Sequence, residues 1–182
     1  KNDPVFEFNK FIIDQTSDLV CAYKPQIAYY EAQGIEGLKS LKRTVEYVNE
    51  KYPYIPIICD AKRADIGSTS QQYAKSLFDY FGFDAVTVNP YLGFDAVEPF
   101  LNYKNKGVII LCRTSNPGAS DFQDLKINTT PLYMEVAKKV VVWNKTYGNC
   151  LMVVGATWPQ QLKKVRGLAK DMFFLIPGIG AQ

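Results

Sequence analysis

One short stretch of the sequence carries residue types that can do acid–base chemistry. It reads Asp-Ala-Lys-Arg-Ala-Asp-Ile-Gly over residues 60–67 and directly follows an apolar run. Alternate residues of a strand point the same way, so Asp60 and Lys62 would project together from the end of that run. Asp65 would follow on a loop. Because the sequence has no histidine, proton transfer must use Lys, Asp, Glu, Tyr or Cys, and this Asp-Lys-Asp array is the leading candidate.

These residues need a scaffold, and the sequence predicts one in which helices and strands alternate. Short apolar runs without polar alternation are typical of parallel strands buried on both faces, and amphipathic segments between them fit crossover helices. We expect strands at residues 19–24, 55–60, 85–88, 107–112, 150–154 and 173–176. We expect helices at residues 5–15, 35–51, 71–80, 94–101, 131–147 and 159–169. The pattern indicates the α/β class with a parallel sheet.

The placement of polar residues favours a barrel over a doubly wound sheet. Five successive strands end on residues of active-site types, at Lys24, Asp60 with Lys62, Asn89 to Tyr91, Arg113 to Asn116, and Pro177 to Gly180. A doubly wound sheet gathers ligand groups at one switch point, whereas a (β/α)8 barrel carries them around its carboxyl-terminal face. A complete barrel has eight strands and about 200 to 250 residues. We therefore expect residues 1–182 to form a single TIM-barrel domain, incomplete at both ends, that lacks the first and last strands.

Composition and charge argue against several classes of protein. The chain has 182 residues, 47% of them hydrophobic, which is enough to bury one sizeable core. The net charge of +3 comes from basic residues spread along the chain, which predicts no nucleic-acid partner. No apolar stretch reaches the roughly 18 to 20 residues of a membrane helix, and the first residues do not resemble a signal peptide. We expect a cytoplasmic protein without a membrane partner.

The cysteines are interpreted as buried thiols. Cys21, Cys59, Cys112 and Cys150 each fall in or beside an apolar run, and none belongs to a CxxC pair. Zinc sites use close spacing or histidines. We therefore expect no structural metal.

Five motifs occur in order along the chain. They are Lys24 at a strand end, DAKRADIGST at 60–69, TVNPYLG at 87–93, RTSNPG at 113–118 and IPGIGAQ at 176–182. Together they resemble the orotidine 5′-monophosphate decarboxylase family, in its longer-chain subgroup, over essentially the whole sequence. The resemblance implies a homodimeric (β/α)8 barrel that converts orotidine monophosphate to uridine monophosphate and carbon dioxide in de novo pyrimidine biosynthesis, without metal or cofactor.

The resemblance also assigns roles to individual residues. It makes Lys24, Asp60, Lys62 and Asp65 a catalytic tetrad in which Lys62 donates the proton. Opposite charges within about 4 to 6 Å of one another stabilise the charged forms of both partners. In the family, Asp65 and its neighbours reach the other subunit's site, so the active sites would be shared between two chains.

Seven further residues are expected to bind the substrate. Ile66 and Thr69 would act across the dimer interface, Ser115 would hydrogen-bond the pyrimidine, and the remaining four would lie at the phosphate: Pro177, Gly178, Gly180 and Gln182. Glycines let the backbone approach an anion closely. The connection at residues 114–130 is long enough to predict a functional lid.

Three alternatives stay open at this stage. By itself, Asp60-Lys62-Asp65 also fits a structural ion-pair network at a strand end. A magnesium-dependent sugar-phosphate decarboxylase of the same barrel superfamily, such as 3-keto-L-gulonate 6-phosphate decarboxylase, shares the Asp-x-Lys-x-x-Asp pattern. The residues after Asp65 and the position of Lys24 fit it less well. A non-catalytic phosphate-binding barrel is the third alternative.

Overall fold

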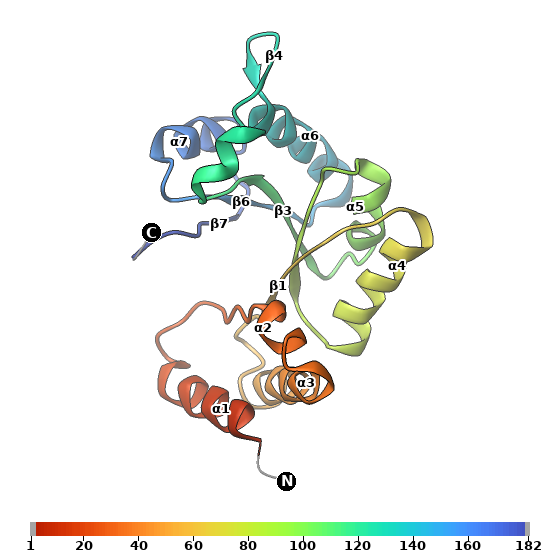
Figure 1. The fold of residues 1–182 in the computed structure, drawn as a ribbon, viewed down its shortest axis with the longest axis vertical. Coiled ribbons are helices and arrows are strands. Elements are labelled where there is room, and N and C mark those ends of the chain that lie inside the picture. Colours follow the sequence, from red (N-terminus) through yellow and green to blue (C-terminus); the bar gives the residue numbers. More distant parts are fainter. Residues whose placement is uncertain (1–2, 181–182) are drawn as a thin grey trace.

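The computed structural model describes residues 3–180, and its centre is a parallel sheet whose strands follow chain order. Strand β1 is Ile58–Arg63, β2 is Ala85–Val88, β3 is Gly107–Arg113, β6 is Cys150–Val154 and β7 is Phe174–Leu175. They pair in parallel in the order β1-β2-β3-β6-β7 (Figure 1). Each strand thus lies beside its successor, which is the winding of a barrel, whereas a doubly wound sheet reverses its order part way.

Helices connect the strands. They are α1 (Pro4–Thr16), α2 (Ile27–Glu31), α3 (Gly34–Lys51), α4 (Gly67–Lys75), α5 (Phe94–Leu101), α6 (Leu132–Tyr147) and α7 (Pro159–Leu168), with a π-helical turn η1 (Ser76–Tyr80) and a 3-10 turn η2 (Pro117–Asp121). A short hairpin of β4 (Lys126–Ile127) and β5 (Thr130–Pro131) lies in the connection between β3 and α6. Figure 1 shows α4, α5 and α6 on the same side of the strands.

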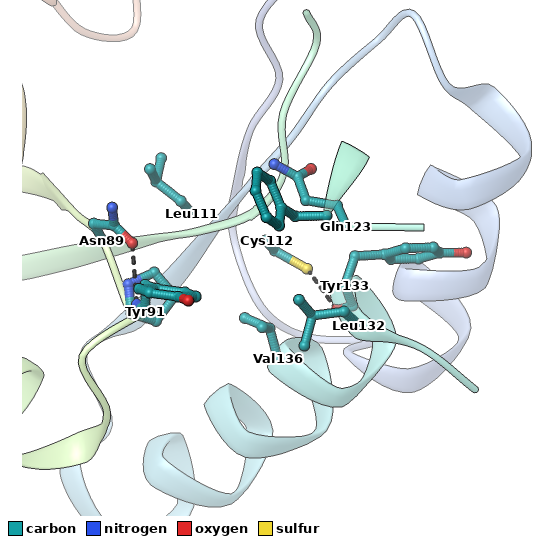
Figure 2. Close-up of a pocket in the computed structure, with 10 residues that line it drawn as sticks. Asn89, Tyr91, Leu111, Cys112, Gln123, Leu132, Tyr133 and Val136 are labelled. Carbon is teal, nitrogen blue, oxygen red and sulfur yellow. Dashed lines mark hydrogen bonds between the residues drawn. The ribbon is translucent and has the colours of Figure 1, made fainter. Parts of the chain in front are cut away.

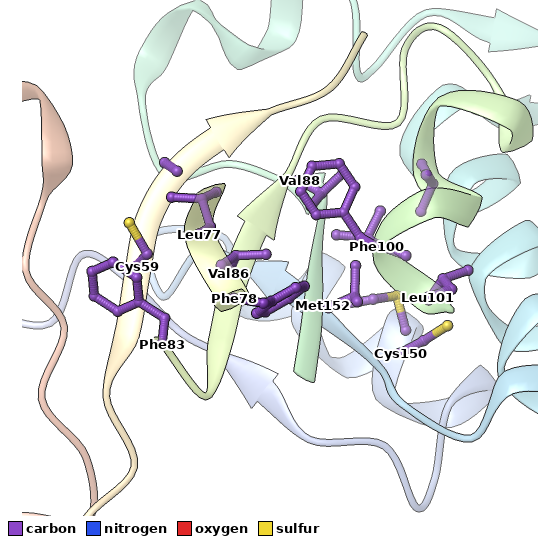
Figure 3. Packing of buried hydrophobic residues seen from close by; sticks show 14 of the residues in the cluster. Cys59, Leu77, Phe78, Phe83, Val86, Val88, Phe100, Leu101, Cys150 and Met152 are labelled. Atoms are coloured by element: carbon purple, nitrogen blue, oxygen red, sulfur yellow. The ribbon is translucent and has the colours of Figure 1, made fainter. Parts of the chain in front are cut away.

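Side-chain alternation along the strands divides the core in two. Val108 and Ile110 of β3 belong to a large cluster between the sheet and the helices, part of which is drawn in Figure 3. Ile109, between them in sequence, packs with Ala85 and Val153 in a smaller cluster on the opposite face. Successive residues of a strand point to opposite faces. The smaller cluster therefore marks the face without helices, which is the inner wall of a barrel.

Most of the predicted elements are confirmed, several of them with the predicted bounds. β2, β6 and α5 begin and end where the pattern places them. β1 is shifted, since it was expected at residues 55–60 and is observed at Ile58–Arg63. Asp60 and Lys62 consequently lie within the strand and not at its end. Three elements were not predicted from the sequence: α2, η2 and the β4–β5 hairpin.

The prediction of a strand at residues 19–24 is wrong. Only isolated parallel bridges form there, from Tyr23 to Ile57 and from Gln26 to Asp60. The segment runs along the edge of β1 because a few hydrogen bonds hold it, including Ile58 N–H to the Tyr23 carbonyl at 2.8 Å.

One of the four cysteines is also not where it was expected. Cys21 is exposed, whereas Cys59, Cys112 and Cys150 are buried as predicted. Cys21 lies in a bend before the first bridge, and its neighbour Leu19 is 76% exposed. The apolar run there does not become a strand with two covered faces, so its side chains remain accessible.

Candidate active site

A cluster of charged side chains lies on the inner face of the sheet, at β1. Asp60 is 8% exposed and is the centre of the cluster. Its Oδ2 accepts a hydrogen bond from Lys24 Nζ at 3.1 Å, and its Oδ1 accepts one from Lys62 Nζ at 2.6 Å. Three of the four expected catalytic residues are therefore brought together, and the two ammonium groups flank one carboxylate.

The ionisation of Asp60 follows from these contacts. Burial alone would raise the pKa of this carboxyl, but the hydrogen bond from Lys62 and the charge of Lys24 outweigh it and hold the pKa below its ordinary value of 3.8. The lysine side chains are 36% and 46% exposed, so both remain accessible from solvent. The cluster presents fixed positive charge beside a fixed negative charge.

Thr87 also belongs to this cluster, although it was not predicted from the sequence as a site residue. Its hydroxyl donates to Asp60 Oδ1 at 2.9 Å and accepts the backbone N–H groups of Ala61 and Lys62, each at 2.9 Å. The signal was present in the sequence. In an apolar strand, a polar residue two positions from inward-facing Ala85 points to the inner face, next to the strand that carries Asp60.

The structure does not bring Asp65 into the cluster. Within residues 3–180, no ion pair joins Asp65 to a lysine, and its Oδ1 accepts the N–H of its neighbour Ile66 at 2.7 Å. Asp65 lies on a loop, as expected, at the entry to α4. Ile66 is 62% exposed and Thr69 is also exposed. These three residues form a surface segment of this chain.

Ser115 lies directly after β3 and is held by the turn after β6. Its carbonyl accepts a hydrogen bond from Thr157 Oγ1 at 2.9 Å. Gly155 packs against its backbone so closely that a Cβ on this glycine would lie 2.7 Å from the Ser115 Cα. Neither Gly155 nor Thr157 was predicted from the sequence as a site residue. Their contact with Ser115 arises because β3 and β6 are neighbours in the sheet.

Residues at the end of β3 also anchor the 114–130 connection. Gln123 accepts the Thr114 N–H at 2.9 Å and donates to Thr114 Oγ1 at 2.8 Å. Arg113 is fully buried; it donates to Gln123 and forms an ion pair with Asp124 at 3.0 Å. A buried guanidinium needs such partners because desolvating a charge is costly. Arg113 thus acts as an anchor for the base of the connection.

The segment expected at the phosphate follows β7. Gly178 and Gly180 adopt φ values of 96° and 105°, in the region that favours glycine. The Pro177 carbonyl accepts the Ala156 N–H at 2.8 Å, which ties this segment to the same turn that holds Ser115. Gln182 lies outside the described residues.

A cavity of about 630 Å³ lies at the same edge of the sheet. Figure 2 shows its walls, which come from the ends of β2 and β3, the 114–130 connection and α6. Among its lining residues, Tyr91 is 82% exposed and Phe122 is 65% exposed. Among the described residues, no member of the charged cluster lines it. The wall is mostly apolar; its titratable side chains are those of Tyr91, Cys112 and Tyr133, and no carboxylate or ammonium group is among the lining residues.

Residues 3–180 lack two features that other classes of protein need. In that range, no group of three or more His, Cys, Asp or Glu side chains is placed to hold a metal ion. None of the described helices has the length and apolar character needed to cross a membrane.

A family model and known sequences match the chain along its length. The model for the orotidine 5'-phosphate decarboxylase / HUMPS family matches residues 6–182. A protein of Cellvibrio japonicus named orotidine 5'-phosphate decarboxylase is 56% identical over 182 residues, which are 100% of this chain and 66% of that protein. One of Janthinobacterium sp. with the same name is 54% identical over 183 residues, again 100% of this chain and 66% of the relative. The chain thus spans slightly less than two thirds of the length of these relatives.

Solved structures resemble the fold closely. An OMP decarboxylase of Leishmania donovani superposes with a TM-score of 0.93 at 40% identity, covering 98% of this chain and 71% of that one. The UMP synthase of the same organism gives 0.93 at 42% identity, covering 97% of this chain and 39% of that one. The expected (β/α)8 class is confirmed, with the described strands forming part of such a barrel.

Proposed function

We propose that this chain, which belongs to the orotidine 5'-phosphate decarboxylase / HUMPS family, carries the site that converts orotidine monophosphate to uridine monophosphate and carbon dioxide in pyrimidine biosynthesis. The observation that carries the proposal is the array of Lys24, Asp60 and Lys62 on the inner face of β1. The names of the relatives support the same reaction. The proposed unit is a single barrel domain.

The chemistry of the reaction needs what this array supplies. Loss of carbon dioxide from C6 of the pyrimidine leaves an electron pair in the ring plane, where the ring's π system cannot delocalise it. A preorganised positive charge next to C6 stabilises that pair as it develops. Lys62 supplies the charge and then transfers its proton to C6. No metal ion or cofactor enters the proposed reaction.

Asp60 and Lys24 complete the array. Asp60 holds both ammonium groups through its two oxygens, at 3.1 and 2.6 Å, so it sets where the positive charge lies. Its carboxylate would also face the carboxylate of the bound substrate. In a site closed to water, charges interact much more strongly than in bulk solvent.

We propose that the active protein is a homodimer with shared sites. Asp65, Ile66 and Thr69 would contribute to the site of the other subunit, with Asp65 completing the tetrad beside the partner's lysine. The exposure of Ile66 and the absence of a lysine partner for Asp65 within residues 3–180 support this arrangement. Twofold dimers use the same patch on both subunits. Each chain would therefore place its own segment at the partner's site, and the partner's segment would lie at its site.

The remaining substrate contacts follow the strand ends. Ser115 would hydrogen-bond the pyrimidine, and Pro177, Gly178, Gly180 and Gln182 would bind the phosphate. The left-handed backbone of both glycines supports this proposal, because it turns the chain tightly enough for N–H groups to converge on an anion. A cytoplasmic location is also proposed, in keeping with cysteines that form no disulfide among the described residues.

The test is the loss of orotidine monophosphate absorbance on adding the intact protein with excess chelator present. We expect decay with formation of uridine monophosphate in the presence of chelator, and no decay with a Lys62→Ala variant. Turnover that needs added magnesium would point to the sugar-phosphate decarboxylase relatives instead. Binding of uridine monophosphate without turnover by a dimeric protein would indicate a binding-only barrel.

A further inference from the structure

The hydroxyl of Thr87 is buried and uses its full hydrogen-bonding capacity. Thr87 is 1% exposed. A hydroxyl has one proton to donate and two lone pairs to accept with. The N–H groups of Ala61 and Lys62 occupy both lone pairs, each at 2.9 Å. The proton must then point to Asp60 Oδ1, also at 2.9 Å. The direction of all three bonds is therefore determined, and two of the three partners are in the charged cluster.

The backbone of β1 departs from regular pairing where it faces Thr87. β1 and β2 pair in register up to Cys59 and again from Arg63, with a shift between them. Three residues of β1 therefore lie opposite Thr87 alone, which is a bulge. Bulged residues lose their ladder partners, and the Thr87 hydroxyl takes the place of a carbonyl for Ala61 and Lys62.

Lys62 has an unusual backbone conformation at this bulge. Its φ is +49°, and within residues 3–180 only Asn128 shares a positive φ among residues other than glycine. Such conformations persist only where the surroundings enforce them, and they concentrate at functional sites. The hydrogen bond from the Lys62 N–H to the Thr87 hydroxyl helps to hold this conformation. The same hydroxyl thus holds the lysine backbone and the carboxylate to which the lysine ammonium is bound.

We propose that Thr87 is a positioning residue for the decarboxylation: its hydroxyl holds the β1 bulge that aims Lys62 and orients the Asp60 carboxylate beside it. The inference rests on the proposed function, since it assigns Thr87 a part in that reaction. Thr87 does not touch the substrate in this account. It acts by keeping the distance between Lys62 Nζ and Asp60 Oδ1 short, at 2.6 Å.

Three variants of the intact protein test the role of the hydroxyl. Thr87→Val keeps the shape and removes the hydroxyl, while Thr87→Ser keeps it. Thr44→Val is a matched control, because Thr44 is also buried, at 4%, and its hydroxyl donates to the Ser40 carbonyl and accepts from Asn9 Nδ2, both outside the cluster. We expect Thr87→Val to lower kcat about a hundredfold, the scale of loss seen when a reacting group is slightly misplaced. Thr87→Ser should stay near the wild type, and Thr44→Val should lower only the melting temperature.

A second measurement tests the contact between Lys62 and Asp60 without relying on catalytic activity. Acetic anhydride labels free amines, and mass spectrometry of the peptides gives the rate at each lysine. Breaking the contact between Lys62 and Asp60 should speed labelling of Lys62 in Thr87→Val, while exposed Lys163 on α7 should label at an unchanged rate. If Thr87→Val does not fold, Thr87→Cys replaces it, because a thiol bonds more weakly and should give intermediate values.

The outcomes separate this inference from the proposed function. Wild-type kcat in Thr87→Val or Thr87→Cys, with only the melting temperature lowered, would overturn the inference and leave the proposed function intact. An inactive wild-type protein would overturn the proposed function, and the labelling of Lys62 would then decide whether Thr87 holds the lysine. Equal labelling in the wild type and in Thr87→Val would contradict the positioning role.

Discussion

Gly155→Ala should impair the site through a single added methyl group. The new Cβ would lie 2.7 Å from the Ser115 Cα and 2.9 Å from its N, whereas ordinary contacts begin near 3.4 Å. Backbone atoms must therefore move apart by about 0.7 Å, the difference between 2.7 and 3.4 Å. Overpacking of this kind costs about 1–3 kcal/mol of folding free energy. Because a displacement of about 1 Å can lower a rate a hundredfold, we expect kcat/KM to fall about tenfold or more.

The assay compares Gly155→Ala with Gly167→Ala in the intact protein. Gly167 lies in α7, and an added Cβ there would have no neighbouring atom within 4 Å. Alanine at this position should raise the free energy of unfolding by about 0.5–1 kcal/mol and leave kcat/KM unchanged. If Gly155→Ala acts through Ser115, it should lower kcat/KM little further in a protein that already carries Ser115→Ala, since the effects of coupled sites are not additive. A Gly155→Ala protein with wild-type stability and kcat/KM would refute the reasoning. If the effects of Gly155→Ala and Ser115→Ala on kcat/KM are fully additive, the claim that Gly155→Ala acts by displacing Ser115 is refuted.

Three other predictions concern residues of the proposed catalytic tetrad. Lys62→Ala should abolish turnover yet lower stability by less than about 1 kcal/mol, because the lysine side chain is 46% exposed and such pairs are weak; a much lower melting temperature would contradict this. Mixing Asp65→Ala with Lys62→Ala subunits should restore part of the activity through heterodimers with one intact site, and no recovery despite proven subunit exchange would count against the shared sites. Folding lowers the pKa of Asp60, so the stability it contributes is present above its ordinary value of 3.8 and is lost as the pH falls through the folded-state pKa. Urea unfolding should show the wild type losing its advantage over Asp60→Asn in that acid range, and a constant difference between the two would argue against the linkage.

Local patterns were sufficient for most of the scaffold. Apolar runs at β2, β3 and β6 predict their strands because each is buried on both faces and needs no alternation with polar residues. The run at residues 19–24 has similar composition but does not form a strand. Whether an apolar run becomes a strand depends on a neighbouring strand that can pair with it, and that neighbour comes from a distant part of the chain.

The candidate site likewise contains residues that local patterns predict and residues that only contacts between distant segments reveal. Asp60 and Lys62 were found from sequence, since their spacing places both side chains on one face of a strand. Strand alternation places Thr87 on the inner face, but its bonds to β1 depend on a register shift between two strands, which no local pattern reports. Gly155 was missed for a similar reason, since only the packing of the turn after β6 against Ser115 requires a residue without a side chain.

The sequence by itself determined the class of fold, the family and the identity of the charged residues. These depend on hydrophobic periodicity and on motifs that are contiguous in the chain. Tertiary structure alone decided that Lys24 and Lys62 share the carboxylate of Asp60, that Lys62 adopts a left-handed backbone, and that Asp65 forms no ion pair with either lysine among the described residues. Each of these depends on the relative placement of strands and loops, which is set by hydrogen bonds and packing between segments far apart in sequence.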